Sequence, residues 1–175
     1  MRRERLPAQP LRGRLSLVRP ARDDDAEMLV AWHADPDVSR YWDEETYTRE
    51  EMLDRLHRPD VDAYVVEADG APVGLVQAWF EEDPVDTGID MFLVPRARGR
   101  GIGPDAARAL VRHLLFALRR PRVTVDPYLW NGPAVRSWTR AGFRAIGERE
   151  PDADHTARWL LMEFDPATLE DDSPR

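Results

Sequence analysis

Apolar residues recur along the chain with two different periods, and these periods divide it into expected strands and helices. Alternation of apolar and polar residues predicts strands, and apolar residues three or four positions apart predict amphipathic helices. Strands are expected at residues 15–19, 63–67, 72–80, 88–94, 122–125, 143–147 and 158–164. Helices are expected at residues 26–33, 48–57, 105–118 and 133–141. This order of elements predicts an α/β protein with a mixed sheet.

The length of the chain and the composition of its two ends predict one domain with a short extension at each end. A chain of 175 residues has the size of a single domain and is long enough to bury a core. Residues 1–14 are arginine-rich, lack the apolar run of a secretory signal, and are expected to form a flexible leader. Residues 167–175 are acidic and are expected to fray as a tail. Residues 15–166 then form the domain.

Composition excludes several classes of function. The chain has no cysteine, which removes disulfides, thiolate metal sites and cysteine nucleophiles. The net charge of −8 argues against a nucleic-acid partner, which needs basic surface, and suits a cationic small molecule. No apolar run approaches the ~18 residues that a membrane span requires, so we expect a cytoplasmic protein without a membrane partner. The histidines show no metal-ligand spacing, and no metal is expected.

The strongest chemical signal is a glycine-rich loop between an expected strand and an expected helix, which reads Arg98-Gly99-Arg100-Gly101-Ile102-Gly103. Glycines leave backbone N–H groups open to a ligand, and a helix N-terminus carries partial positive charge, so this loop favours an anion. Arg98 and Arg100 add two full charges, which makes a pyrophosphate the natural guest. The alternative is a glycine-rich turn without a ligand.

A downstream segment makes the loop part of a larger signature. Asn131 opens the expected helix that ends in Arg140-Ala-Gly-Phe143. Together with the loop, this segment resembles the acetyl-CoA signature of the GNAT acyltransferases, and the resemblance runs from about residue 15 to residue 164. Within that superfamily, aminoglycoside 6'-N-acetyltransferases are similar at Gly88-Ile-Asp90, at Val125-Asp-Pro127 and at Glu150-Pro-Asp152.

The resemblance implies a GNAT fold, in which a central, largely antiparallel sheet is flanked by helices and one splayed strand pair admits acetyl-CoA. It implies direct attack of an amine on the thioester within a ternary complex. Asp90 corresponds to the catalytic carboxylate, which orients the neutral amine and accepts its proton. A backbone N–H near Phe92 stabilises the oxyanion. The residues implied in acetyl-CoA binding are Phe92, Val94, Arg98, Gly99, Arg100, Gly101, Ile102, Gly103, Asn131 and Trp138.

The implied acceptor is a small cationic amine, and specifically an aminoglycoside antibiotic. Asp126 and Asp152 correspond, with Asp90, to acidic substrate contacts of the resembled enzymes, and Asp154 is a near-equivalent of Asp152. Trp42 corresponds to an aromatic residue at the mouth of the antibiotic site. Each of these residues also has a plainer interpretation, as a solvated carboxylate or as a packing aromatic.

Trp138 departs from the resembled pattern. The related enzymes have a tyrosine there, placed to protonate the departing CoA thiolate, whereas an indole N–H donates a hydrogen bond but is no acid near neutral pH. Either water protonates the thiolate, or Trp138 stabilises it by hydrogen bonding alone, or turnover is slow. A thiol pKa of ~8.5 makes the thiolate a good leaving group, so a general acid is helpful and not essential.

Two other functions stay open at this point. Siderophore-type N-acyltransferases act on a hydroxylamine or a lysine-like amine and share these motifs, but they typically carry histidine at the position of Asp90. A GNAT-shaped protein that holds CoA or a cation without turnover is the second. The acidic segment Glu81-Glu82-Asp83 is expected to attract cations to the cleft. The protein is expected to be a monomer or a homodimer.

Overall fold

The computed structural model of this protein describes residues 5–80 and 87–172, with side chains described as far as residue 169. Its strands form one sheet in the order β1-β2-β3-β4-β5-β6-β8-β7. The bounds are β1 Leu11–Arg12, β2 Leu17–Pro20, β3 Val61–Ala68, β4 Ala71–Phe80, β5 Thr87–Leu93, β6 Thr124–Val125, β7 Phe143–Arg149 and β8 Trp159–Phe164. Only the neighbours β5 and β6 are parallel. The predicted α/β class and the mixed, largely antiparallel sheet are therefore confirmed.

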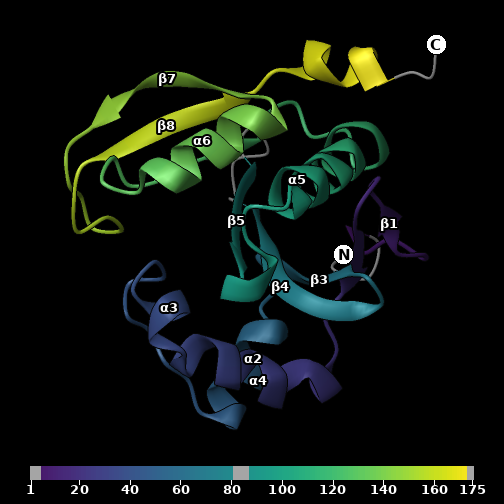
Figure 1. The fold of residues 1–175 in the computed structure, drawn as a ribbon, viewed down its shortest axis with the longest axis vertical. Helices are drawn as coiled ribbons and strands as arrows, with labels where there is room; N and C mark the ends of the chain where they lie inside the picture. The colour runs from purple at the N-terminus through teal and green to yellow at the C-terminus, as the bar shows by residue number, and fades with distance from the viewer. Residues whose placement is uncertain (1–4, 81–86, 173–175) are drawn as a thin grey trace.

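Helices cover both faces of this sheet (Figure 1). Their bounds are α2 Ala26–Ala34, α3 Pro36–Ser39, α4 Arg49–Leu56, α5 Ile102–Arg112 and α6 Gly132–Ala141. Local signals explain several ends: Thr48 and Glu51 cap α4 reciprocally, and the Asn131 side chain accepts the N–H of Ala134 at the start of α6. The helix expected at residues 105–118 begins earlier, at Ile102, and its last turn is a π-helix at His113–Ala117.

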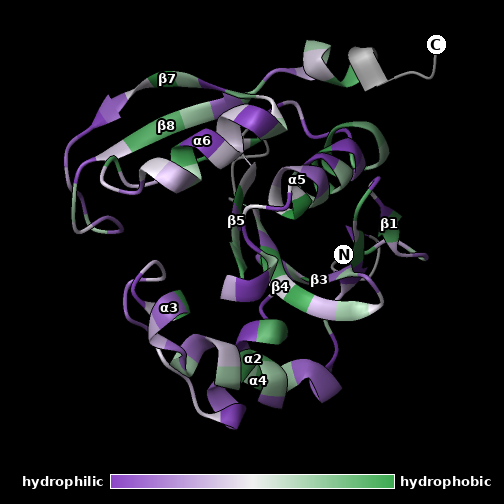
Figure 2. Ribbon diagram, in the orientation of Figure 1, coloured by the Kyte–Doolittle hydropathy of each residue, from purple (hydrophilic) through white to green (hydrophobic). Residues whose placement is uncertain are grey.

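Two packed layers place α2 and α4 on one face of the sheet and α5 and α6 on the other (Figure 1). Strand β5 contributes to both layers, because successive side chains of a strand point to opposite faces. Ile89 and Met91 pack in the layer of α5, and Phe92 packs in the layer of α2 and α4. Asp90 therefore shares the face of Phe92. Hydrophobic residues gather along β4 and β5, and hydrophilic residues predominate at α3 (Figure 2).

Strands β5 and β6 form the splayed pair that the resemblance implies. They pair at Gly88 and Thr124 alone, after which β5 continues to Leu93 on the β4 side while β6 turns to β8. The carboxyl half of β5 thus keeps one partner strand instead of two. A gap between two strands of a sheet leaves backbone groups open to a ligand, and this gap ends at the glycine-rich loop.

The described part of the expected leader, residues 5–14, is instead attached to the domain. Leu11–Arg12 form β1, which pairs with β2. The Arg5 guanidinium binds the buried carboxylate of Asp62 at 3.0 Å, and its backbone carbonyl contacts His113 at 2.7 Å. The sequence interpretation missed these contacts because each joins residues more than fifty positions apart.

The expected C-terminal tail begins inside an ordered element. Residues Pro166–Asp172 form a 3-10 helix, and Leu169 is buried in the core cluster. The acidic segment 81–83 lies outside the described residues. None of the described helices is long and apolar enough to cross a membrane.

Candidate active site

Asp90 lies on β5 beside an indole from the neighbouring strand. The Trp79 side chain of β4 donates its N–H to a carboxylate oxygen of Asp90, and the Arg58 guanidinium lies over the Trp79 ring. The two strands pair with Asp90 opposite Gln77, so Trp79 is the diagonal neighbour on the same face. The hairpin register therefore aims the indole N–H at the carboxylate.

The surroundings of Asp90 favour its protonated form. Burial, and after it the negative charge of Asp126, raise the pKa of the Asp90 carboxyl to about 7, while the Trp79 N–H and the charge of His155 oppose that rise. A carboxyl with a pKa near neutrality can accept a proton from an amine and release it to solvent. Perturbed carboxyls of this kind gather at catalytic sites.

The predicted substrate residues Asp126 and Asp152 are brought together by a histidine between them. His155 contacts Asp126 through Nε2 at 3.1 Å and Asp152 through Nδ1 at 2.8 Å. Asp126 follows β6 directly, and Asp152 and His155 lie in the loop between β7 and β8. Asp154 donates its backbone N–H to the Asp152 side chain at 2.9 Å and so supports the loop. The three acids predicted to contact the substrate, Asp90, Asp126 and Asp152, thus lie in one region.

Trp42 lies on the same face of the sheet as Asp90. It packs against Phe92, the next β5 residue whose side chain points to that face. Its ring packs edge to face with Phe92 at 5.3 Å and with His33 at 5.7 Å. His33 is buried, and that burial lowers the pKa of its ring to about 4, so the ring is neutral. The Tyr47 ring also packs edge to face with the His33 ring. Trp42 is held in a fixed aromatic cluster two residues along β5 from Asp90.

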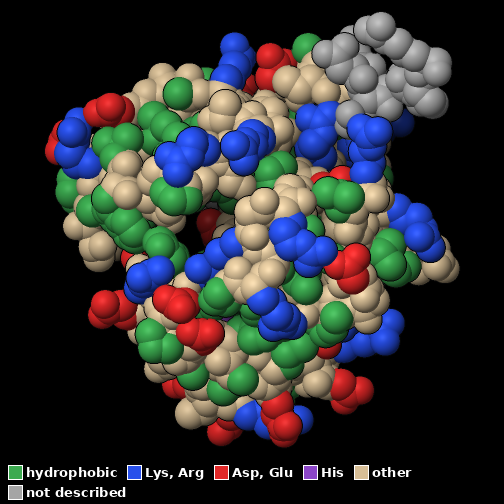
Figure 3. Space-filling view, viewed as in Figure 1, with side chains coloured by type: hydrophobic (Ala, Val, Ile, Leu, Met, Phe, Trp, Pro, Cys, Tyr) green, Lys and Arg blue, Asp and Glu red, His purple; other side chains and the backbone are tan. Residues whose placement is uncertain are grey.

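An aromatic stack joins the two halves of the molecule beside this region. Trp130 lies between Tyr41 and Tyr128, with ring centroids at 5.9 and 5.5 Å, and half of Trp130 is exposed. The Tyr128 hydroxyl donates to Asp43 at 2.8 Å. The surface is hollowed between the half with α6, β7 and β8 and the half with α2, α3 and α4, and an acidic side chain is visible inside the hollow (Figure 3). The acidic side chain gives this hollow the sign of charge that attracts a cation.

The glycine-rich loop has the backbone that an anion site requires. Gly99 and Gly101 have φ of +72° and +78°, which glycine adopts without strain. Gly101 is the N-cap of α5, so the first N–H groups of this helix have no partner within it. The side chains of Val94 and Ile102 are buried in the core. Ile102, in the first turn of α5, can meet acetyl-CoA through its backbone N–H. The Val94 backbone already bonds Val73 and Ala97, at 2.9 and 3.0 Å, so its contact with acetyl-CoA stays a prediction.

The two arginines of the loop have other partners than the predicted pyrophosphate. Arg98 donates to the carbonyl oxygens of Leu93 and Asp37, at 2.9 and 2.7 Å, and thereby ties the loop to β5 and α3. Arg100 forms an ion pair with Asp69 at 2.6 Å. Both arginine side chains therefore anchor the loop, and their contact with the predicted anion stays a prediction, as does that of the helix N-terminus.

Trp138 packs in the core instead of standing free in the cleft. It is 7% exposed, and its ring meets the edge of Phe143 at 5.3 Å. Asn131 uses its side-chain oxygen as the N-cap of α6. Both residues therefore have structural roles, and a contact of either with acetyl-CoA stays a prediction.

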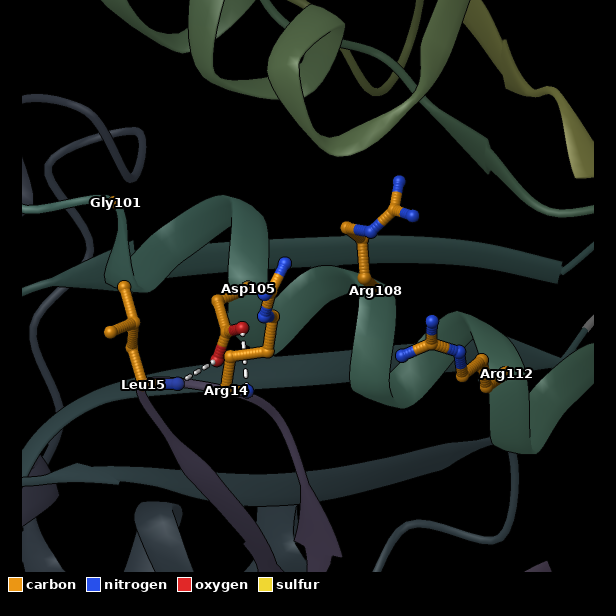
Figure 4. A pocket seen from close by; sticks show the side chains of 6 residues that line it. All are labelled: Arg14, Leu15, Gly101, Asp105, Arg108 and Arg112. Atoms are coloured by element: carbon orange, nitrogen blue, oxygen red, sulfur yellow. Dashed lines mark hydrogen bonds between the residues drawn. The ribbon is translucent and has the colours of Figure 1, made fainter. Parts of the chain in front are cut away.

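A separate cavity of about 380 Å³ lies along α5, beside the segment that joins β1 to β2 (Figure 4). Asp105 of α5 accepts the N–H groups of Arg14 and Leu15 there, at 2.8 and 3.0 Å. Gly101 is the one residue it shares with the predicted site. This cavity marks where the N-terminal segment docks on α5.

Sequence reasoning missed Trp79 and His155. Trp79 sits in an alternating strand, and it becomes a site residue only when the β4–β5 register is known. His155 follows Asp152 by three residues in a turn, a spacing that allows the side chain to contact its own loop. That spacing was a usable signal, whereas the contact with Asp126 joins residues 29 positions apart. Among the described residues no group of acids and histidines is placed to hold a metal ion.

Comparisons with known proteins agree with this fold. The aminoglycoside N(6')-acetyltransferase type 1 of Klebsiella pneumoniae is 28% identical over 144 residues, covering 71% of this chain and 72% of that protein. The solved structure of AAC(6')-Ib with paromomycin and acetyl-CoA has the same fold, with a TM-score of 0.78 and 24% identity, covering 91% of this chain and 98% of that one. The structure of spermidine N-acetyltransferase of Vibrio cholerae, with CoA and spermine, has a TM-score of 0.71 and 19% identity. The match covers 86% of this chain and 95% of that one.

The family assignment rests on a match to the family itself over most of this chain. The acetyltransferase (GNAT) domain family matches residues 21–159, which include Asp90, the glycine-rich loop, Asp126 and Asp152. The enzymes of this family transfer an acyl group from acyl-CoA to an amine, with acetyl-CoA as cosubstrate in the solved relatives. This chain belongs to the GNAT acetyltransferases.

Proposed function

We propose that this protein transfers the acetyl group of acetyl-CoA to an amine of an aminoglycoside. The observation that carries the proposal is the convergence of Asp90, Asp126 and Asp152 on one region, since an aminoglycoside is a compact polycation. Several carboxylates around one ligand favour several ammonium groups over one. The related Klebsiella enzyme, named for aminoglycoside 6'-acetylation, supports the same substrate class.

Each acid has a separate task in this proposal. Asp126 and Asp152 bind ammonium groups that do not react and hold the acceptor in place. Asp90 orients the reacting amine and takes its proton as the nitrogen attacks the thioester carbonyl. The C–N bond forms, the C–S bond breaks, and the electron pair leaves with the CoA sulfur. A backbone N–H of β5 near Phe92 stabilises the oxyanion, and water protonates the thiolate.

The glycine-rich loop would hold the other substrate. The N-terminus of α5 faces the pyrophosphate of acetyl-CoA with free N–H groups. The pantetheine arm enters where β5 and β6 diverge, because β5 lacks a second partner strand there. This route leads from the loop along β5 to Asp90, which lies on the same strand.

The direct test is CoA release from acetyl-CoA in the presence of kanamycin, with an N-hydroxylysine substrate in parallel. We expect kanamycin-dependent release, and we expect Asp90→Asn to lower kcat by about 100-fold or more because the proton acceptor is lost. Asp24→Asn is the matched control, since Asp24 is an exposed carboxylate outside the site. Release with the hydroxylamine alone would assign the protein to siderophore-type acylation. CoA binding without turnover of any amine would contradict an enzymatic role.

A further inference from the structure

His155 contacts a carboxylate at each of its two ring nitrogens. Nδ1 lies 2.8 Å from Oδ1 of Asp152, and Nε2 lies 3.1 Å from Oδ2 of Asp126. An ionised carboxylate only accepts hydrogen bonds, whereas a neutral imidazole has one N–H and one lone pair. Both contacts are hydrogen bonds only when both nitrogens carry a proton. The arrangement therefore requires an imidazolium.

The ring is held in this position from several sides. It stacks on Trp159 of β8 at 4.1 Å and 14°, and Tyr128 meets it edge to face at 6.0 Å. Its side chain is 14% exposed, against 45% for each of the two carboxylates. The packing against Trp159 and Tyr128 fixes the position of the imidazole ring. The ring in turn holds the carboxylates of Asp126 and Asp152 in place through its two contacts.

Among the described residues, the charges that act on the ring are those of two carboxylates. Asp126 and Asp152 face it directly, and Asp90 on β5 lies within range of its charge. Burial disfavours the charged ring, but the hydrogen bond to Asp152 and the charge of Asp126 outweigh burial and raise the pKa of His155 above its ordinary value. The hydrogen bond from His155 in turn lowers the pKa of Asp152.

We propose that His155 is a positioning residue that holds Asp126 and Asp152 together as an internal cation and so sets the negative charge that a cationic acceptor meets. This inference rests on the proposed function for the identity of the acceptor. With the ring charged, part of the acidic site is already neutralised. When the ring loses its proton, one carboxylate loses its hydrogen bond and the site gains one net negative charge, so a polycation binds more tightly.

The charge of His155 can be measured without any substrate. NMR titration of the labelled imidazoles, with His155→Gln for assignment, is expected to give His155 a pKa above the ordinary ~6.5, and Asp152→Asn is expected to lower it. Titration of the Asp90 carboxyl is expected to move to higher pH in His155→Gln, because a nearby positive charge is lost. A His155 pKa that does not respond to Asp152→Asn would overturn the proposal.

The effect on the acceptor is read from kanamycin binding by calorimetry. At about pH 6, His155→Gln is expected to bind kanamycin roughly three- to tenfold more tightly than the wild type, and at about pH 9 the two are expected to agree within about twofold. Both proteins are compared at the same pH, so they meet the same charge state of free kanamycin. His57→Gln is the control, since His57 pairs with Asp23 on the surface away from the site.

The outcomes separate this inference from the proposed function. Equal affinities at both pH values, or weaker binding by His155→Gln at both, would show that His155 has no charge-setting role and would overturn the inference. If wild-type protein does not bind kanamycin at all, the proposed acceptor fails. In that case the titration of Asp90 tests the inference about His155 without a ligand. An Asp90 pKa that is unchanged in His155→Gln would show that the charge of His155 does not reach the site, and would overturn the inference.

Discussion

Asp90 illustrates how one hydrogen bond tunes a catalytic candidate. Its pKa is raised to about 7 by burial and by Asp126, and the Trp79 N–H limits that rise because it stabilises the charged form. At the residue scale, activity therefore depends on the ionised fraction of Asp90. The acid limb of kcat/KM is expected near pH 7, with activity lost below it as Asp90 becomes protonated.

Replacing Trp79 by phenylalanine keeps most of the ring and removes the N–H. The pKa of Asp90 is then expected to rise, and the acid limb of kcat/KM to move upward by about one to two pH units, since a hydrogen bond to a charged group is worth about 1.5–3 kcal/mol. The plateau at high pH is expected to change little. The measurement is a pH–rate profile of both proteins, and an unshifted limb would mean that this hydrogen bond does not control the Asp90 titration.

At the scale of elements, the glycine-rich loop matters through its backbone. Gly101 has φ of +78° and caps α5, and the Cβ of an alanine there would be 3.5 Å from Leu15, so space is available but the backbone is strained. We expect Gly101→Ala to raise the KM for acetyl-CoA severalfold. The left-handed backbone conformation at this position costs an alanine about 1–2 kcal/mol, so the loop shifts away from the conformation that binds the ligand. Steady-state kinetics with varied acetyl-CoA measure this.

The hairpin turn between β3 and β4 offers a matched control for that substitution. Gly70 has a φ of +76° and nothing within 4 Å of the position of a Cβ. Gly70→Ala therefore imposes the same kind of backbone strain outside the glycine-rich loop, next to Asp69, the partner of Arg100. It is expected to lower the melting temperature with a smaller rise in the KM for acetyl-CoA. A KM that rises equally in both variants would show that the effect is global destabilisation.

At the scale of the whole molecule, the N-terminal segment joins elements that are distant in sequence. Arg5 binds the fully buried Asp62 of β3, donates to the carbonyl of Pro59 at 2.6 Å and lies over Phe80 at 4.3 Å. Removing one partner of such a pair leaves a buried charge less well satisfied. This segment is part of the stability of the sheet.

We expect Arg5→Ala to lower the free energy of unfolding by about 2 kcal/mol. The exposed Arg12 lies in the same segment, so Arg12→Ala is the matched control and is expected to have a much smaller effect. Urea denaturation of the three proteins makes the comparison. Equal stability of Arg5→Ala and the wild type would mean that the segment contributes nothing through this contact.

Local patterns in the chain were sufficient for the fold class and for most of the elements. Periods of two and 3.6 residues, the Thr48 and Asn131 caps and the Asp69-Gly70 turn act within a few positions of each other, so their physics is visible in the sequence. The same holds for the glycine-rich loop, whose backbone conformation is a property of its own residues. The strand at Leu11–Arg12, inside the expected leader, was not predicted, because it forms only by pairing with β2.

The composition of the site needed the long-range packing of the sheet. Asp90, Asp126 and Asp152 were predicted through a family resemblance, but their mutual placement follows from the order β5-β6-β8-β7. Trp79 and His155 act through neighbours on other elements, and the partners of Arg98 and Arg100 likewise come from distant segments. Electrostatic effects depend on distance in space and on burial. A carboxyl pKa near neutrality therefore becomes visible only after the strands have been assembled.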